Sequence, residues 1–128
     1  RHWLSDPESP IFYDKSAFFP SVQEVAKAIH NAGGLCFLAH AFLYSPQIPE
    51  KLDELARLLD GLECHYGTFT KEKKLFLTDY CDNNGLFKSG GSDFPGLDMR
   101  PKNIMGYSAG ERIEYELAAP WLDKMTFV

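Results

Sequence analysis

Four residues with metal-binding or acid–base side chains stand at or near the ends of short apolar segments. They are His40, Glu63, His65 and Asp93, and the hydroxyl-bearing Ser92 directly precedes the last of them. Imidazole and carboxylate groups suit zinc, iron or manganese, and carboxylates also bind magnesium. An ion held there would lower the pKa of a bound water and bind a phosphate oxygen. The residue types therefore fit metal-assisted hydrolysis of a phosphate ester.

The segments that must position these residues alternate between strand and helix patterns. Short apolar runs at 35–39, 62–66 and 86–89 predict three buried strands. Helices are predicted from Ser21 to Gly33, from Glu50 to Leu59 and from Lys71 to Asp82, with Ser21 and Glu24 as a capping box at the start of the first. A weaker strand near Ile104–Tyr107 and a short helix at Tyr115–Ala119, before Pro120, complete the sequence.

Strands that alternate with helices imply right-handed crossovers and a parallel sheet, so the predicted fold class is α/β. In such a sheet the carboxyl ends of the strands meet at one edge, where ligands bind. We therefore expect the four candidate residues to share this edge. Glu63 and His65 are two residues apart and would face the same side of an ideal strand.

Each candidate also has a purely structural interpretation. His40 can be a hydrogen-bonded residue at the edge of the sheet, and Glu63 can cap a turn or pair with a lysine. His65 can be a surface or packing histidine, and Asp93 can be a turn or N-cap residue after its glycines. His30, near the end of the first helix, is interpreted as structural because helix C-termini favour cations.

Composition excludes several classes of protein. The net charge of −5 argues against a basic surface for nucleic acid. No apolar run approaches the roughly 20 residues of a membrane span, and no signal peptide is visible. Cys36, Cys64 and Cys81 form no C-x-x-C pair, which fits a reducing compartment. We expect a cytoplasmic protein with a single unit over residues 1–128, whose motif-bearing core spans about 20–107.

Three motifs, in order, resemble the PHP (polymerase and histidinol phosphatase) family of metal-dependent phosphoesterases. Residues 33–40, Gly-Gly-Leu-Cys-Phe-Leu-Ala-His, resemble the family's Gly-Gly segment that ends in Leu-Ala-His-Pro. Residues 60–63, Asp-Gly-Leu-Glu, resemble its Asp-Gly-Ile-Glu strand. Residues 90–94, Gly-Gly-Ser-Asp-Phe, resemble its Gly-Gly-Ser-Asp-Phe-His segment. With similar helices between them, the motifs cover about residues 20–96 and resemble the C-terminal half of the family's domain.

The resemblance implies part of a distorted (β/α)7 barrel that holds divalent ions at its strand ends and hydrolyses phosphate esters. His40 matches the histidine ligand of the Ala-His-Pro segment, and Asp93 matches the aspartate ligand of the last motif. Glu63 matches a strand residue that is not a standard ligand. The implied cofactors are zinc, manganese, iron or magnesium ions, and the implied substrate is a phosphorylated small molecule or nucleotide.

The sequence also departs from the family. Pro95 stands at the position of a second histidine, Phe69 stands where a histidine often precedes the helix, and Ala41 replaces a proline. The N-terminal His-x-His motif and its later partner ligands are absent, and the sequence begins at Arg1. We therefore expect the N-terminal half of the domain to lie outside this sequence as its main partner. Decay of the site is the competing explanation.

Three functional hypotheses follow. The first is a PHP phosphoesterase of which these 128 residues carry part of the site, so that in isolation they are inactive. The second is a degenerate PHP-like scaffold or regulatory binding module. The third is a fragment of an amidohydrolase-like barrel, because those enzymes also place histidine and aspartate at strand ends.

Overall fold

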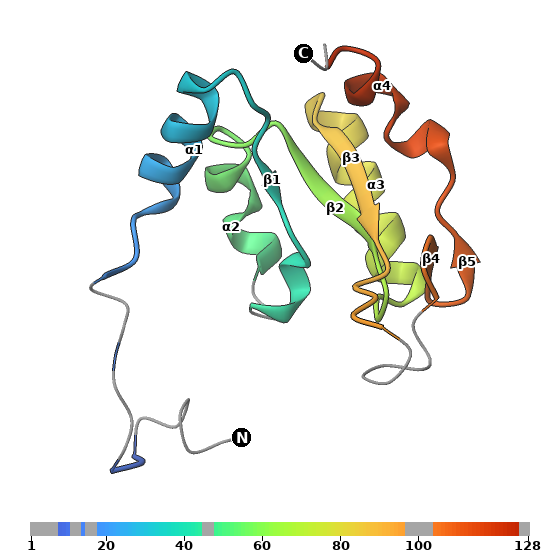
Figure 1. Cartoon of the computed structure of the whole chain (residues 1–128), viewed down its shortest axis with the longest axis horizontal. Helices are drawn as coiled ribbons and strands as arrows, with labels where there is room; N and C mark the ends of the chain where they lie inside the picture. Colours follow the sequence, from blue (N-terminus) through green and yellow to red (C-terminus); the bar gives the residue numbers. More distant parts are fainter. Residues whose placement is uncertain (1–7, 11–13, 15–17, 45–47, 97–103, 126–128) are drawn as a thin grey trace.

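A three-stranded parallel sheet runs through the centre of the protein (Figure 1). The computed structural model describes residues 8–10, 14, 18–44, 48–96 and 104–125. The strands are β1 (Phe37–Leu38), β2 (Gly61–Tyr66) and β3 (Phe87–Gly91), in the order β1-β2-β3. Both pairings of β2 are parallel, which confirms the prediction that the three strands are parallel neighbours in an α/β fold.

Helices alternate with these strands as predicted. They are α1 (Val22–Asn31), α2 (Ile48–Leu55) and α3 (Lys71–Asn84), and a 3-10 turn, η3 (Ala41–Leu43), follows β1. The predicted capping box begins α1: the Glu24 N–H donates to Ser21 Oγ, and the Ser21 N–H donates to the Glu24 carboxylate. Gly85 ends α3 in the left-handed conformation, with φ 67°, which glycine adopts without a Cβ clash.

The hydrophobic core lies between the sheet and the helices. Figure 1 shows α3 behind β2 and β3. The fully buried side chains of this core include Leu52 of α2, Leu62 and Cys64 of β2, and Leu77 and Cys81 of α3. The Sγ atoms of Cys64 and Cys81 lie 3.6 Å apart, and the three cysteines are free thiols. These buried side chains pack β2 against α3. The opposite face of the sheet is in contact with other segments.

The C-terminal segment covers part of that opposite face. It contains η4 (Tyr115–Leu117) and α4 (Ala119–Leu122). The Trp121 ring packs on Phe37 with a centroid distance of 5.0 Å, and its indole N–H donates to the carbonyl of Lys88 at 2.9 Å. Gly61 makes this packing possible, because a Cβ there would lie 2.3 Å from the Phe37 ring. Trp121 therefore covers the face near the amino ends of the strands.

A β-bulge in β2 determines which residues face which side. The register pairs Glu63 with Ser89 and His65 with Gly90, so Cys64 is an extra residue in β2. Cys64 points into the core beside Cys81, and His65 lies near Lys74 of the same helix. Glu63 and Tyr66 instead contact His40 and Asp93. The expectation that Glu63 and His65 face the same side is therefore wrong, because the bulge interrupts the alternation.

Several predicted boundaries also differ. Helix α2 spans Ile48–Leu55 instead of the predicted Glu50–Leu59, and the backbone beyond it leads to Asp60, whose N–H donates to Cys36 O at 2.8 Å. The weak strand predicted at 104–107 is a two-residue strand, β4 (Tyr107–Ser108), that pairs antiparallel with β5 (Glu111–Arg112) and not with the parallel sheet. Pro120 lies in the first turn of α4, where its missing N–H costs no helical hydrogen bond, so it does not end a helix as predicted.

A buried lysine attaches the β4–β5 hairpin to α3. Lys74 is 5% exposed, and its Nζ donates to the Ser108 carbonyl at 2.7 Å and to the Glu111 carboxylate at 2.9 Å. Ser108 is fully buried, and its Oγ donates to the carbonyl of Tyr66 at 2.6 Å. These bonds connect the hairpin to the carboxyl end of β2.

We expect Lys74→Met to lower the free energy of unfolding by roughly 1–3 kcal/mol, because the buried Ser108 carbonyl loses its charged donor. Lys71→Met, at an exposed position in the same helix, is the matched control and should change it by less than about 0.5 kcal/mol. Urea unfolding followed by circular dichroism measures both. Equal effects of the two substitutions would show that the Lys74 bonds do not stabilise the fold.

Candidate metal centre

Three of the candidate residues gather at the carboxyl ends of the strands. The backbone N–H of His40 donates to the Glu63 carboxylate at 2.6 Å, which connects the end of β1 to β2. The same carboxylate lies against Gly91 of β3, where a Cβ would lie 2.8 Å from Glu63 Oε1. Glycine at this position therefore allows the carboxylate to sit between the strands.

Tyr66 connects the remaining candidate to this group. Its hydroxyl donates to Asp93 Oδ2 at 2.9 Å, and its ring meets the His40 ring edge-on with a centroid distance of 5.3 Å. His40 and Asp93 therefore flank one buried tyrosine, which is 5% exposed. Sequence reasoning missed Tyr66. The available signal was a tyrosine at the end of a buried strand, because a buried phenol needs a hydrogen-bond partner.

The backbone is strained at both predicted ligands. Within the described residues, three other than glycine have positive φ: His40 at 31°, Asp93 at 49° and Ala109 at 50°. Such conformations cost of order 1–3 kcal/mol and persist where the surrounding structure enforces them, often at functional sites. The conformation of His40 turns the backbone from β1 into η3 and aligns its N–H with Glu63.

The fit of a divalent ion to these residues is partial. The Nδ1 atoms of His40 and His65 are both buried and have no hydrogen-bond partner among the described residues. Of the two, His40 is the one whose ring contacts Tyr66, so it offers a nitrogen that a ligand at this edge could satisfy. Asp93 offers a carboxylate at an exposed position. Across the described ranges, however, no three histidine, cysteine, aspartate or glutamate side chains form a group that could hold an ion. The donors are of the right chemistry, and a complete site needs further ligands.

Burial raises the pKa of Glu63 above its ordinary value. The hydrogen bond from the His40 N–H acts in the opposite direction, and the nearby Asp93 carboxylate raises the pKa further. Two acidic side chains thus lie close enough to repel one another. A cation placed between them would relieve that repulsion.

His65 lies in a different environment from the other candidates. A pocket of ≈ 190 Å³ outside the sheet is lined by His65, Leu75 and Thr78, together with Lys71, Lys74 and Glu111. Burial lowers the pKa of His65, and the positive charge of Lys74 lowers it further. The structure thus groups His65 with α3 and the hairpin and does not bring it to Glu63.

Ser92, Phe69 and Pro95 lie in three different environments. Ser92 is buried next to Asp93. Phe69 is 1% exposed and packs between Tyr66 and Phe42 with centroid distances of 5.3 and 5.5 Å, so it belongs to an aromatic part of the core. Pro95 is exposed, and its side chain has no metal-binding atom.

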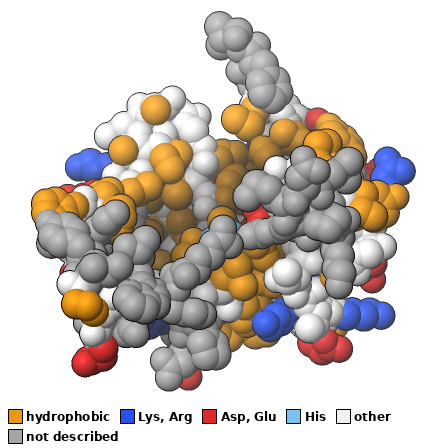
Figure 2. All heavy atoms as spheres, turned by 60° about the horizontal axis from the view of Figure 1, so that its bottom comes forward, with side chains coloured by type: hydrophobic (Ala, Val, Ile, Leu, Met, Phe, Trp, Pro, Cys, Tyr) orange, Lys and Arg blue, Asp and Glu red, His pale blue; other side chains and the backbone are white. Residues whose placement is uncertain are grey.

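The face that carries the strand ends is hollowed at its centre (Figure 2). Where side chains are described, hydrophobic ones line the recess and lysine, arginine, aspartate and glutamate lie mainly at the margin.

No helix among the described residues has the length and apolar character that crossing a membrane requires.

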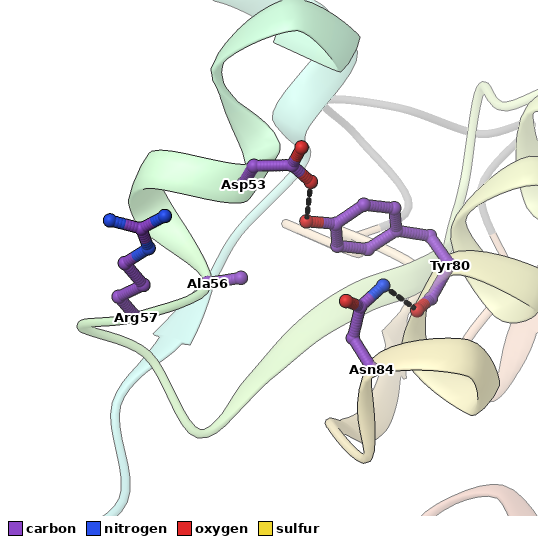
Figure 3. Close-up of a pocket in the computed structure, with 5 residues that line it drawn as sticks. All are labelled: Asp53, Ala56, Arg57, Tyr80 and Asn84. Atoms are coloured by element: carbon purple, nitrogen blue, oxygen red, sulfur yellow. Dashed lines mark hydrogen bonds between the residues drawn. The ribbon is translucent and has the colours of Figure 1, made fainter.

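A second pocket, of ≈ 390 Å³, lies between α2 and α3 (Figure 3). Asp53, Ala56, Arg57, Tyr80 and Asn84 line it. The Tyr80 hydroxyl donates to Asp53 Oδ1 at 2.7 Å, and burial together with this bond raises the pKa of Tyr80 to about 12. Because Asn84 ends α3 just before β3 begins, this pocket lies toward the amino ends of the strands, away from His40 and Asp93.

A solved structure shares this arrangement of helices and strands. It is the crystal structure of a protein from Bifidobacterium adolescentis that is described as a putative metal-dependent phosphoesterase. The TM-score is 0.71, with 25% sequence identity over 99% of the present sequence. The match covers 45% of that protein, so the present sequence spans less than half of its length. No protein-family profile and no curated protein matches the sequence.

The pKa of His65 predicts a pH dependence of stability. Because the folded pKa lies below the unfolded value, the unfolded protein takes up the proton first as the pH falls. His65 therefore lowers the free energy of unfolding as the pH drops below about 6.5, and has no such effect above that pH. We expect His65→Gln to lose less stability than the wild type between pH 7.5 and pH 5.5 in urea unfolding. Parallel pH profiles of the two proteins would contradict this expectation.

Proposed function

We propose that this protein is the C-terminal part of a PHP-type metal-dependent phosphoesterase domain. The observation that carries the proposal is that His40, with its unpartnered buried Nδ1, and Asp93 both lie beside Tyr66 at the carboxyl edge of the parallel sheet. The likeness to a protein described as a metal-dependent phosphoesterase supports the same reaction class. The complete domain would be a distorted (β/α)7 barrel, to which these residues contribute three parallel strands.

In this proposal His40 and Asp93 are the ligands that the described residues supply. A bound zinc, manganese, iron or magnesium ion would lower the pKa of a water molecule and bind a phosphate oxygen of the substrate. Glu63 holds the His40 backbone through the bond to its N–H, and so sets where the imidazole lies. The substrate would be a phosphorylated small molecule or a nucleotide.

The remaining ligands must come from outside these 128 residues in this proposal. The partner would be the N-terminal half of the same domain, because two ligands are too few for a reactive metal centre. The likeness to 45% of a longer protein is compatible with such a division.

A non-catalytic scaffold is the second candidate function. Phe69 is a core residue, and Pro95 offers no ligand atom, at two positions where the family places histidines. A domain without these two histidines could keep its fold and one ion but lose hydrolysis. The amount of metal and the turnover distinguish the two candidates.

The activity of the full-length protein tests the enzyme hypothesis. We expect it to hydrolyse p-nitrophenyl phosphate with added Mn²⁺, and His40→Ala to reduce the rate at least about tenfold through loss of metal. The isolated 128 residues should show no turnover above their own His40→Ala variant. A full-length protein that binds metal without any turnover would favour the scaffold.

Metal content tests the ligand assignment. We expect at most two ions per full-length molecule, and a larger loss of metal in Asp93→Asn than in His65→Ala. The reason is that the Asp93 carboxylate offsets the charge of a divalent ion, whereas His65 lies beside Lys74 on the helix side. Mass spectrometry under native conditions measures the stoichiometry. Three ions in the wild type, or full occupancy in Asp93→Asn, would overturn the assignment.

A further inference from the structure

Tyr66 is held more firmly than either residue that it connects. Its carbonyl accepts a 2.6 Å bond from the fully buried Ser108 Oγ, and the next residue, Gly67, accepts a bond from the Ala109 N–H at 3.2 Å. Its ring packs edge-on against Phe69, which is itself in the core. Backbone and ring are thus fixed independently by the hairpin and by the aromatic core.

Asp93, in contrast, is an exposed residue in the segment that follows β3. Its φ of 49° is unfavourable for an aspartate, so it needs support from its neighbours. The Tyr66 hydroxyl supplies a donor to its Oδ2 at 2.9 Å. The bond connects the end of β2 to the segment after β3 and restricts how the carboxylate can rotate.

His40 meets the same tyrosine through its ring. The Tyr66 and His40 rings are 5.3 Å apart at 68°, and Tyr44 lies 5.2 Å from His40 on another side. The Tyr66 ring therefore limits the rotation of the imidazole, while its hydroxyl limits that of the carboxylate. One side chain thus contacts both the imidazole and the carboxylate.

We propose that Tyr66 is the positioning residue of the proposed metal site, restricting the Asp93 carboxylate through its hydroxyl and the His40 imidazole through its ring. The inference rests on the proposed function. A ligand that is already oriented loses little conformational freedom when an ion binds, and groups that hold ligands in this way typically change metal affinity by about 10–100-fold. The competing role for Tyr66 is packing alone.

Tyr66→Phe separates positioning from packing, because it keeps the ring contacts with His40 and Phe69 and removes the hydroxyl that donates to Asp93. We expect the Kd of the full-length protein for Mn²⁺, measured by competition with a chelator, to rise about tenfold or more. The matched control is Tyr80→Phe, which removes another tyrosine–aspartate bond, to Asp53, in the pocket between α2 and α3. We expect the control to leave the Kd within about twofold of the wild type.

Two further measurements guard against indirect effects. In an Asp93→Ala background, adding Tyr66→Phe should not weaken Mn²⁺ binding further, because the acceptor is already gone. In the unsubstituted protein, with ¹³Cζ-labelled tyrosine, the Tyr66 resonance should shift on addition of the diamagnetic ion Zn²⁺ while the Tyr80 resonance stays in place. This measurement holds even if Tyr66→Phe fails to fold.

The outcomes are distinguishable. Three results would each overturn the positioning role and leave the proposed function intact. They are a wild-type Kd for Mn²⁺ in Tyr66→Phe, an equal rise of the Kd in Tyr80→Phe, and a Tyr66 resonance that does not shift when Zn²⁺ is added. A wild-type protein that binds neither Mn²⁺ nor Zn²⁺ would overturn both.

Discussion

The parallel pairing of β2 with both of its neighbours is the constraint on which the rest of the structure depends. It places the carboxyl ends of three strands at one edge, so residues that are 53 positions apart in the sequence, His40 and Asp93, both reach Tyr66. An antiparallel pairing of β2 with either neighbour would send one of them to the opposite end of the sheet. The bulge at Cys64 then decides which side chains of β2 face that group.

The elements that could be predicted from the sequence are those with local causes. The capping box at Ser21 and Glu24 depends on neighbours within one turn, and the start of α1 was predicted correctly from it. Helix α3 was predicted to end at Asp82, and in the structure it continues to Asn84, where the left-handed Gly85 ends it. The parallel order followed from strands that alternate with helices. These features can be predicted without knowing which distant residues are in contact.

The failures depend on contacts between distant residues. No pattern within β2 shows that Cys64 is an extra residue, because the bulge exists only relative to β3. Apart from Phe69, Tyr66 contacts His40, Asp93 and Ser108, which lie 26 to 42 residues away and which no local period encodes. The antiparallel β4–β5 hairpin likewise depends on Lys74 of α3. The assignments of His40 and Asp93 as ligands remain predictions, since what the structure supplies is their proximity to Tyr66.

The indole of Trp121 has a consequence for how the sheet can grow. The Phe87 N–H points toward β2, where it meets the carbonyl of Asp60, so the carbonyl of the next residue, Lys88, points away from β2. The indole N–H of Trp121 donates a hydrogen bond to that carbonyl from outside the sheet. At Lys88 a further strand would have to displace the indole before it could pair, which protects this edge from association with other proteins.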